Sequence, residues 1–155
     1  MSDPSARTGR AQAFRHILVP VSGEPDDEPL VRAAARLAQV HKARLSVVYV
    51  VEVPMELPED AEDVPGARKA DEVLNQMEKV AGIDLDPVVL QAREPGQAIV
   101  EQAIDSAADL IFMGVHVRER MGVLTLGKTA TYVLRHAPCT VWVCRWVAPG
   151  AGEKG

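Results

Sequence analysis

The fold is decided by residues 109–132, which read DLIFMGVHVRERMGVLTLGKTATY. A short apolar run of strand character ends at Gly114, a polar and basic loop follows, and a helical segment resumes at Gly127. A loop that ends at a helix N-terminus presents free backbone N–H groups and the positive end of the helix dipole, and both favour a phosphate or another anion. We therefore expect the rest of the chain to be the scaffold that positions this loop.

Four other apolar runs predict strands. Residues 16–21 form a continuous apolar run, as expected of a central strand that is buried on both faces of a parallel sheet. Residues 45–51 are dense in β-branched side chains, and residues 87–92 begin with a proline that suits a strand start or a sheet edge. Residues 139–146 are a further β-rich run. With residues 109–114, the sequence predicts five strands.

Helical spacing of apolar side chains separates these strands. Four helices are predicted, over residues 30–41, 68–80, 97–107 and 129–136. Asp26 or Asp27 is the candidate N-cap of the first helix, and the acidic, proline-rich residues 52–66 indicate a solvated, flexible loop. This alternation predicts an α/β fold with a five-stranded, open, doubly wound parallel sheet. In such Rossmann-like sheets, ligands bind at the C-terminal ends of the strands near a topological switch.

Length and charge limit the function. The 155 residues fit one domain, which we expect over residues 14–147, between a flexible leader at 1–13 and a flexible tail at 148–155. A net charge of −5 and an aromatic content of 4% argue against nucleic acid and anionic membranes as partners. The sequence shows no signal peptide or membrane-spanning run, so a cytoplasmic protein is expected. Cys139 and Cys144 have no metal-ligand spacing, and we expect both to be buried thiols.

Residues 122–129 match the spacing of a P-loop, G-x-x-x-x-G-K-[ST], in which backbone N–H groups wrap phosphates. The context differs from that of a working P-loop, which leaves its strand directly into the first glycine. Here seven residues, 115–121, separate Gly114 from Gly122. A P-loop NTPase therefore remains an alternative that would require Mg²⁺-dependent turnover sensitive to Lys128→Ala.

A second interpretation comes from resemblance. The segment ILVPV at residues 17–21, Gly114 with Gly127, and the segment LRHAPCTV at residues 134–141 resemble the universal stress protein family, over about residues 14–146. The resemblance implies a five-stranded, adenine nucleotide alpha-hydrolase-like sheet, dimerisation and, in one branch, ATP binding. That branch's loop reads G-x-x-G, nine residues, then G-[ST], and the two glycines fall on its first and last glycine positions.

Three positions depart from this family pattern. Val117 stands at the middle glycine, where a side chain is costly if the loop needs positive φ. Lys128 replaces the hydroxyl residue after the last glycine, although Thr129 could supply a hydroxyl one place later. Ser22 replaces the acidic residue that closes the first strand and helps to hold the nucleoside. We therefore expect phosphate contacts to be retained better than nucleoside contacts.

The resemblance implies a nucleotide site built from the strand ends and the glycine loop. The predicted binding residues are Pro20, Val21, Ser22, Val50, Met113, Gly114, His116, Val117, Gly127, Lys128 and Thr129. The expected ligand is ATP or another adenine nucleotide, bound weakly, and Mg²⁺ would accompany it. The alternatives without a binding role are that the two glycines only form a turn and a helix start, and that His116 is a solvated loop side chain.

No Ser/His/Asp or Cys/His constellation is recoverable from the sequence, so we predict no catalytic residue, no resident metal and residual ATP hydrolysis at most. The competing function is a nucleotide-free interaction domain that is recognised by a protein partner. We also predict a homodimer through the last strand, residues 141–146, because an edge strand with large side chains and free backbone groups favours pairing with its own copy. Trp142 and Trp146 are evenly spaced and should share one face.

Overall fold

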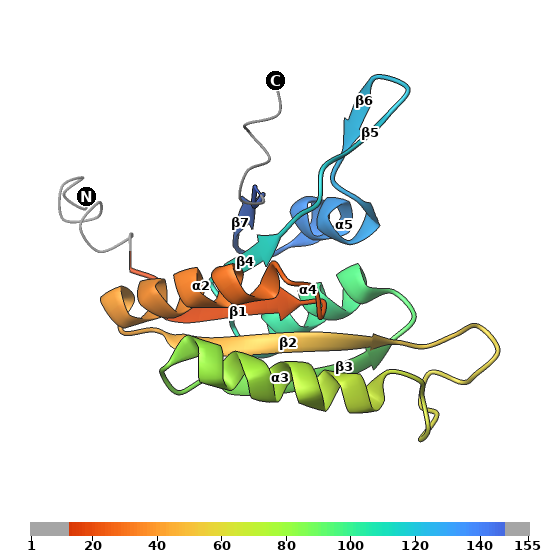
Figure 1. Ribbon diagram of the computed structural model, residues 1–155, viewed down its shortest axis with the longest axis horizontal. Helices are drawn as coiled ribbons and strands as arrows, with labels where there is room; N and C mark the ends of the chain where they lie inside the picture. The colour runs from red at the N-terminus through yellow and green to blue at the C-terminus, as the bar shows by residue number, and fades with distance from the viewer. Residues whose placement is uncertain (1–12, 148–155) are drawn as a thin grey trace, which may run out of the picture.

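A computed structural model describes residues 13–147 of the chain. The predicted leader, apart from Ala13, and the predicted tail at 148–155 lie outside the described residues. Within them the predicted five-stranded parallel sheet is confirmed, in the strand order β3-β2-β1-β4-β7 (Figure 1). The strands are β1 (His16–Val21), β2 (Arg44–Glu52), β3 (Asp86–Ala92), β4 (Leu110–Gly114) and β7 (Thr140–Cys144).

The first strand is central, as its continuous apolar run predicts. Ile17, Leu18 and Val19 are completely buried, because helices cover both faces of the sheet. Ile17 and Val19 point into one core with α2 (Asp27–His41) and α3 (Ala67–Ala81), and Leu18 points into the other with α4 (Pro95–Asp105) and α5 (Lys128–His136). The sheet is therefore doubly wound, with α2 and α3 on one face and α4 and α5 on the other (Figure 1).

The strand order creates a topological switch beside β1. The chain runs from β1 outward to β2 and β3, then returns to the other side of β1 as β4 and continues to β7. Strands β1 and β4 pair through Ile17 with Leu110 and Leu18 with Ile111. Because connections leave these two neighbouring strands in opposite directions, a crevice opens outside their C-terminal ends.

Both edge strands match the sequence interpretation. Pro87 lies in β3, which is one edge of the sheet and has β2 as its only sheet neighbour among the described residues. The other edge is β7, which is shorter than the predicted run because it ends at Cys144. Trp142 contacts the rings of Phe14 and Phe112, and Trp146 packs on the same core, so the two tryptophans share one face as expected.

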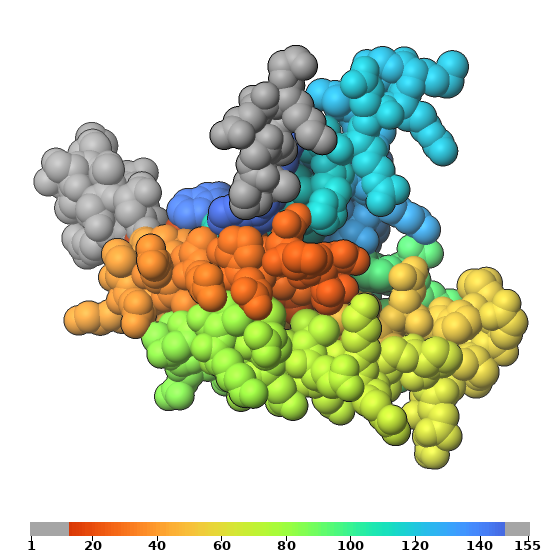
Figure 2. Space-filling model, in the orientation of Figure 1, coloured from red at the N-terminus to blue at the C-terminus, as the bar shows by residue number. Residues whose placement is uncertain are grey.

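The loop after β4 contains a β-hairpin that the sequence analysis did not predict. Its strands are β5 (Arg118–Arg120) and β6 (Val123–Thr125), and they pair antiparallel. Met121 and Gly122 form the turn with φ of 53° and 78°, the double positive φ of a type I′ turn. The hairpin (cyan) and residues 53–66 (yellow) project from the body of the molecule (Figure 2), on the side toward which the strand arrows of β1 and β2 point in Figure 1. A methionine in the first turn position gives no turn signal, so the hairpin was missed.

Residues 53–66 are largely exposed, as predicted, but side chains at the end of β3 hold them. The amide of Gln91 donates to the carbonyl oxygens of Glu59 and Ala61, at 2.7 Å each. The guanidinium of Arg93 donates to the carbonyl of Leu57 at 2.6 Å. The interpretation of this segment as a simple solvated loop was therefore incomplete, because its acidic composition gives no sign of these anchors.

The predicted N-cap of α2 is confirmed in position, because Asp26 is the N-cap residue, but neither Asp26 nor Asp27 makes a side-chain capping hydrogen bond. The Asp27 carboxylate instead accepts the backbone N–H groups of Ser22 and Gly23. The prediction for the cysteines was wrong: Cys139 and Cys144 are half-buried rather than buried, because Cys139 precedes and Cys144 ends β7, an edge strand with one sheet neighbour among the described residues. Desolvation raises the pKa of both thiols above the ordinary cysteine value.

Candidate functional site

A cavity of about 890 Å³ lies outside the C-terminal ends of β1, β2 and β4. Of the predicted binding residues, the structure brings together Pro20, Val21, Ser22, Val50, Met113, Gly114, His116, Gly127, Lys128 and Thr129 along its wall. Val117 is the exception and does not line it. The cavity occupies the switch point of the sheet, which is where ligands bind in open α/β folds.

Strain at Val117, expected from the family pattern, does not arise. Its φ is not positive, since the non-glycine residues with positive φ in the described chain are Lys42, Ala107 and Met121. The chain passes the middle-glycine position without positive φ, and within residues 114–127 positive φ occurs at Met121, Gly122 and Gly127. Valine is therefore tolerated at this position. The expectation of a strained backbone was wrong, because the loop does not have positive φ where the family pattern has its middle glycine.

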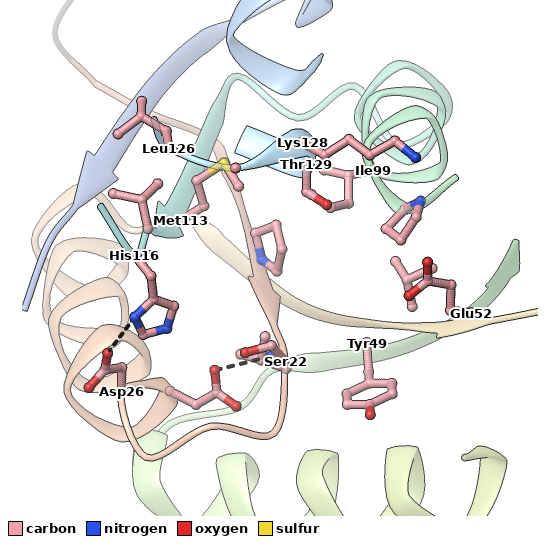
Figure 3. A pocket seen from close by; sticks show the side chains of 18 of the residues that line it. Ser22, Asp26, Tyr49, Glu52, Ile99, Met113, His116, Leu126, Lys128 and Thr129 are labelled. Atoms are coloured by element: carbon pink, nitrogen blue, oxygen red, sulfur yellow. Dashed lines mark hydrogen bonds and ion pairs between the residues drawn. The ribbon is translucent and has the colours of Figure 1, made fainter. Parts of the chain in front are cut away.

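One part of the cavity wall is apolar. Pro20 and Val21 come from β1, Val50 from β2 and Met113 from β4, and Ile99 of α4 joins them from the covering helix (Figure 3). The sequence analysis placed Ile99 on the core face of its helix and missed it as a site residue. A helical pattern identifies which side chains turn toward the sheet but not which of them reach a strand end.

The rim of the cavity is charged. Asp26, Glu52 and Glu119 contribute carboxylates, and Arg118, Arg120 and Lys128 contribute cations. His116 is exposed, as in the solvated-loop interpretation, but its Nδ1 lies 3.7 Å from a carboxylate oxygen of Asp26 (Figure 3). This contact is an ion pair when the imidazole is protonated, and it links the start of the glycine loop to the β1–α2 turn.

Asp27 is a buried carboxylate in the wall of the cavity. Its oxygens lie 3.1 Å from the Ser22 nitrogen and 2.7 Å from the Gly23 nitrogen, so both are engaged by the turn that follows β1. Desolvation raises the pKa of Asp27, and the two backbone hydrogen bonds oppose that effect. The only sequence signal was an acid in the first turn of a helix, which is also what an ordinary capping residue shows.

The start of α5 forms the opposite part of the wall. Gly127 precedes the helix with φ 87° and ψ 167°, a region of backbone conformation that is essentially restricted to glycine. Its carbonyl accepts the Thr131 N–H and hydroxyl at 3.1 Å and 2.7 Å. A glycine in the N-cap position offers no side chain to the first-turn N–H groups, which leaves them to water or to a ligand.

The two glycines of the loop differ. The backbone of Gly127 requires glycine, which fits the interpretation of a helix-start residue. Gly114 has no positive φ, and a Cβ there would lie 3.8 Å from Leu30 and 3.9 Å from the Cys144 carbonyl, both ordinary contact distances. Local geometry therefore does not require glycine at position 114, so the turn-glycine interpretation does not account for it.

The P-loop alternative does not match the observed backbone. Residues 122–127 run through the hairpin turn and the exposed strand β6 before they reach α5. A P-loop curls compactly around phosphate directly after a strand of the main sheet. The spacing match at residues 122–129 therefore occurs without the conformation that gives it meaning.

Among residues 13–147, no group of three or more His, Cys, Asp or Glu side chains is placed to hold a metal ion.

None of the helices in the described residues has both the length and the apolar character needed to cross a membrane.

Fold and cavity together define a small doubly wound α/β domain with a ligand-sized crevice at its switch point. The universal stress protein family model matches residues 13–145, and the chain belongs to that family. The resemblance seen in the sequence is thereby confirmed.

Three relatives match this chain over nearly their whole length. The universal stress protein in the QAH/OAS sulfhydrylase 3′ region of Thermus aquaticus is 32% identical over 136 residues, which are 85% of this chain and 99% of that protein. The structure of universal stress protein UspA from Lactobacillus plantarum has a TM-score of 0.67 at 27% identity and covers 86% of this chain and 99% of its own. That of the universal stress protein from Archaeoglobus fulgidus in complex with dAMP has a TM-score of 0.66 at 20% identity, covering 85% and 98%.

Proposed function

We propose that the protein is a regulatory binding domain that takes an adenine nucleotide in the cavity at the strand ends. The observation that carries the proposal is the combination, in one cavity of about 890 Å³, of an apolar wall and a glycine-opened helix N-terminus. Ligand pockets of about 300–1,000 Å³ with an apolar lining and a few polar groups are typical of small-molecule sites. The Archaeoglobus fulgidus relative, whose structure contains dAMP, supports adenine as the base.

The lining residues suggest how the two ends of a nucleotide would be held. The base would lie against Val50, Ile99 and Met113, which are three of the apolar side chains of the wall. The phosphates would accept the first-turn N–H groups of α5 at Lys128 and Thr129, where the helix dipole favours negative charge. Mg²⁺ would enter with the phosphates, since the site needs no resident metal in this arrangement.

The nucleoside end is the weaker half. Ser22 stands where family members of the ATP-binding branch place an acid, and the nearby Asp27 carboxylate is buried and already accepts one backbone N–H group on each oxygen, so it is a poor substitute for that acid. A lost hydrogen bond to a charged group costs about 1.5–3 kcal/mol, roughly tenfold or more in affinity. We therefore expect affinities in the micromolar range or weaker, which are carried mainly by phosphate contacts.

A second function, a nucleotide-free interaction domain, is favoured by a separate observation. The edge strand β7 exposes Trp142 and Val143 at 42% and 40%, and the hairpin exposes Met121 and Leu124 at its end. Exposed apolar side chains on an unpaired strand edge are suited to pairing with another strand. In this proposal the partner across β7 is a second copy of the chain, and the homodimer is compatible with nucleotide binding because β7 lies outside the cavity wall.

Calorimetric titration with ATP, ADP and AMP, with and without Mg²⁺, tests the proposal. We expect saturable binding of ATP, and Lys128→Ala should weaken ATP more than AMP because its charge acts on the distal phosphates. Ser22→Asp should strengthen binding by restoring the missing acceptor. If ATP at millimolar concentration gives no saturable signal, and Ser22→Asp does not restore one, the interaction-domain function takes its place.

We assign no catalytic residue, so hydrolysis beyond a residual rate is not part of this proposal. The role in a stress response and the cytoplasmic localisation both remain predictions. A measured turnover that requires Mg²⁺ and is abolished by Lys128→Ala would contradict this assignment.

A further inference from the structure

A second cavity, of about 490 Å³, adjoins the first on the outer side of α5. It lies between the start of α4 and the exposed face of α5, and Thr125, Gly127, Lys128 and Thr129 line both cavities. A Cβ at Gly127 would meet no heavy atom within 4 Å, so the ridge between the cavities is bare backbone with open space above it. A ligand held at the helix N-terminus can therefore continue from the first cavity into the second.

The second cavity is lined by groups that suit phosphate and a planar ring. Arg135 and Lys128 supply positive charge, and Lys128 extends toward α4, where its Nζ lies 3.5 Å from a carboxylate oxygen of Glu94 (Figure 3). This ion pair is exposed, so exchanging Glu94 for a phosphate partner costs little. Tyr132 and His136 pair their rings at a centroid distance of 4.3 Å and an angle of 37°, and both line the cavity.

We propose that the two cavities together bind an adenine nucleotide whose phosphate chain carries a second nucleoside, that is, a dinucleoside polyphosphate. The inference rests on the proposed function, because it extends the same site and names its ligand class. The phosphate chain crosses Gly127 beside the first-turn N–H groups of α5 and reaches Lys128 and Arg135. The second base lies against the Tyr132–His136 pair, where stacking on aromatic rings holds any base.

This ligand class accounts for a departure from the family pattern. Lys128 stands where the ATP-binding branch has Ser or Thr, and it lines both cavities, with its Nζ 3.5 Å from Glu94 in the wall of the second. A hydroxyl serves a terminal phosphate within the first cavity, whereas a lysine that reaches over the ridge serves phosphates that lie beyond it. The Lys128 charge is therefore placed for a phosphate chain that continues into the second cavity, and the Tyr132–His136 pair lies where the second base of the ligand would be.

Calorimetry of the full chain with P1,P3-di(adenosine-5′) triphosphate and with ATP tests the proposal. ATP is the matched ligand, since it lacks only the second adenosine. We expect one dinucleotide per chain, bound about tenfold more tightly than ATP, the order of magnitude of one base stacked on an aromatic group. Arg135→Ala and His136→Ala, both at exposed positions, should weaken the dinucleotide and leave ATP binding unchanged. Arg32→Ala, an exposed arginine on α2, is the control and should change neither affinity.

Three results would overturn the inference: equal affinities for the two ligands, two dinucleotides bound per protein chain, or no effect of Arg135→Ala on dinucleotide affinity. None of them would overturn the proposed function, which is tested by the ATP titration alone. Absence of binding by both ligands would overturn the inference and the proposed function together. Binding of ATP alone, with the dinucleotide excluded, would show that the ridge at Gly127 closes the first cavity and would also overturn the inference.

Discussion

Replacing Gly127 by alanine tests how the site is built. The glycine has φ 87° and ψ 167°, and a Cβ would touch nothing within 4 Å, so the cost is conformational and not steric. Holding a non-glycine residue in this region costs about 1–3 kcal/mol. For a domain of this size each kcal/mol lowers Tm by about 2–4 °C, so we expect a fall of roughly 2–12 °C by thermal circular dichroism. Any relaxation moves the first-turn N–H groups of α5, and calorimetry should show at least a tenfold loss of ATP affinity.

Two other glycines separate stability from binding. Gly82 also has positive φ, 68°, with open space at its Cβ, and it ends α3 outside the cavity wall. Gly82→Ala should lower Tm, at a cost of about 1–2 kcal/mol, without weakening ATP. Gly114→Ala should leave Tm unchanged and weaken ATP binding, because the φ of Gly114 tolerates a side chain but the residue lines the cavity. A Tm of Gly127→Ala equal to that of the wild type would refute the conformational reasoning, and equal losses of affinity in Gly82→Ala and Gly127→Ala would assign the binding loss to instability.

Three further predictions follow from the described contacts. The raised pKa of Asp27 favours its protonated form in the fold, so its contribution to stability is fully present below pH 3.8 and is lost as the pH rises through the raised pKa. Urea titrations of the wild type and Asp27→Asn should therefore show that the difference between their unfolding free energies falls as the pH rises over this window. A rise in that difference would contradict the prediction. Gly96→Ala would place a Cβ 2.8 Å from Tyr132 Cβ, so thermal unfolding should show a loss of about 1–3 kcal/mol, whereas an unchanged Tm would mean that α4 and α5 separate freely. Val143→Arg should convert the predicted β7 dimer to a monomer in sedimentation at micromolar concentration, and a wild type that is already monomeric would remove the prediction.

The strands, and which of them are central or at an edge, could be predicted because each is indicated by its own short stretch of sequence. The continuous apolar run of residues 16–21 indicates two covered faces, and Pro87 indicates an edge, whatever the rest of the chain does. The position of the site could be predicted for the same reason, since parallel strands that alternate with helices place their C-terminal ends on one side. The residues quoted for the resemblance then pointed to the strand ends that line the cavity.

Other parts of the site depend on distances that the sequence does not contain. Asp27 reads as a first-turn helix acid, and only the turn after β1 shows that it holds the Ser22 and Gly23 N–H groups. Ile99 reads as core, and the hairpin strands of three residues each are too short to show a period. The second cavity involves two helices, with Glu94 and Arg135 far apart in sequence, so no pattern along the chain reveals it.

Ser22 and Asp27 explain together why the nucleoside half of the cavity departs from the family pattern. An acid at position 22 would stand beside a carboxylate that is already desolvated, and its charge would raise the pKa of Asp27 further. A serine avoids that repulsion while its N–H still anchors the turn to Asp27. The cost is the acceptor for the nucleoside, so the gain expected from Ser22→Asp is opposed by the charge on Asp27. In the proposed nucleotide complex, most of the affinity would then come from the phosphate side, where Gly127 opens the helix and Lys128 supplies the charge.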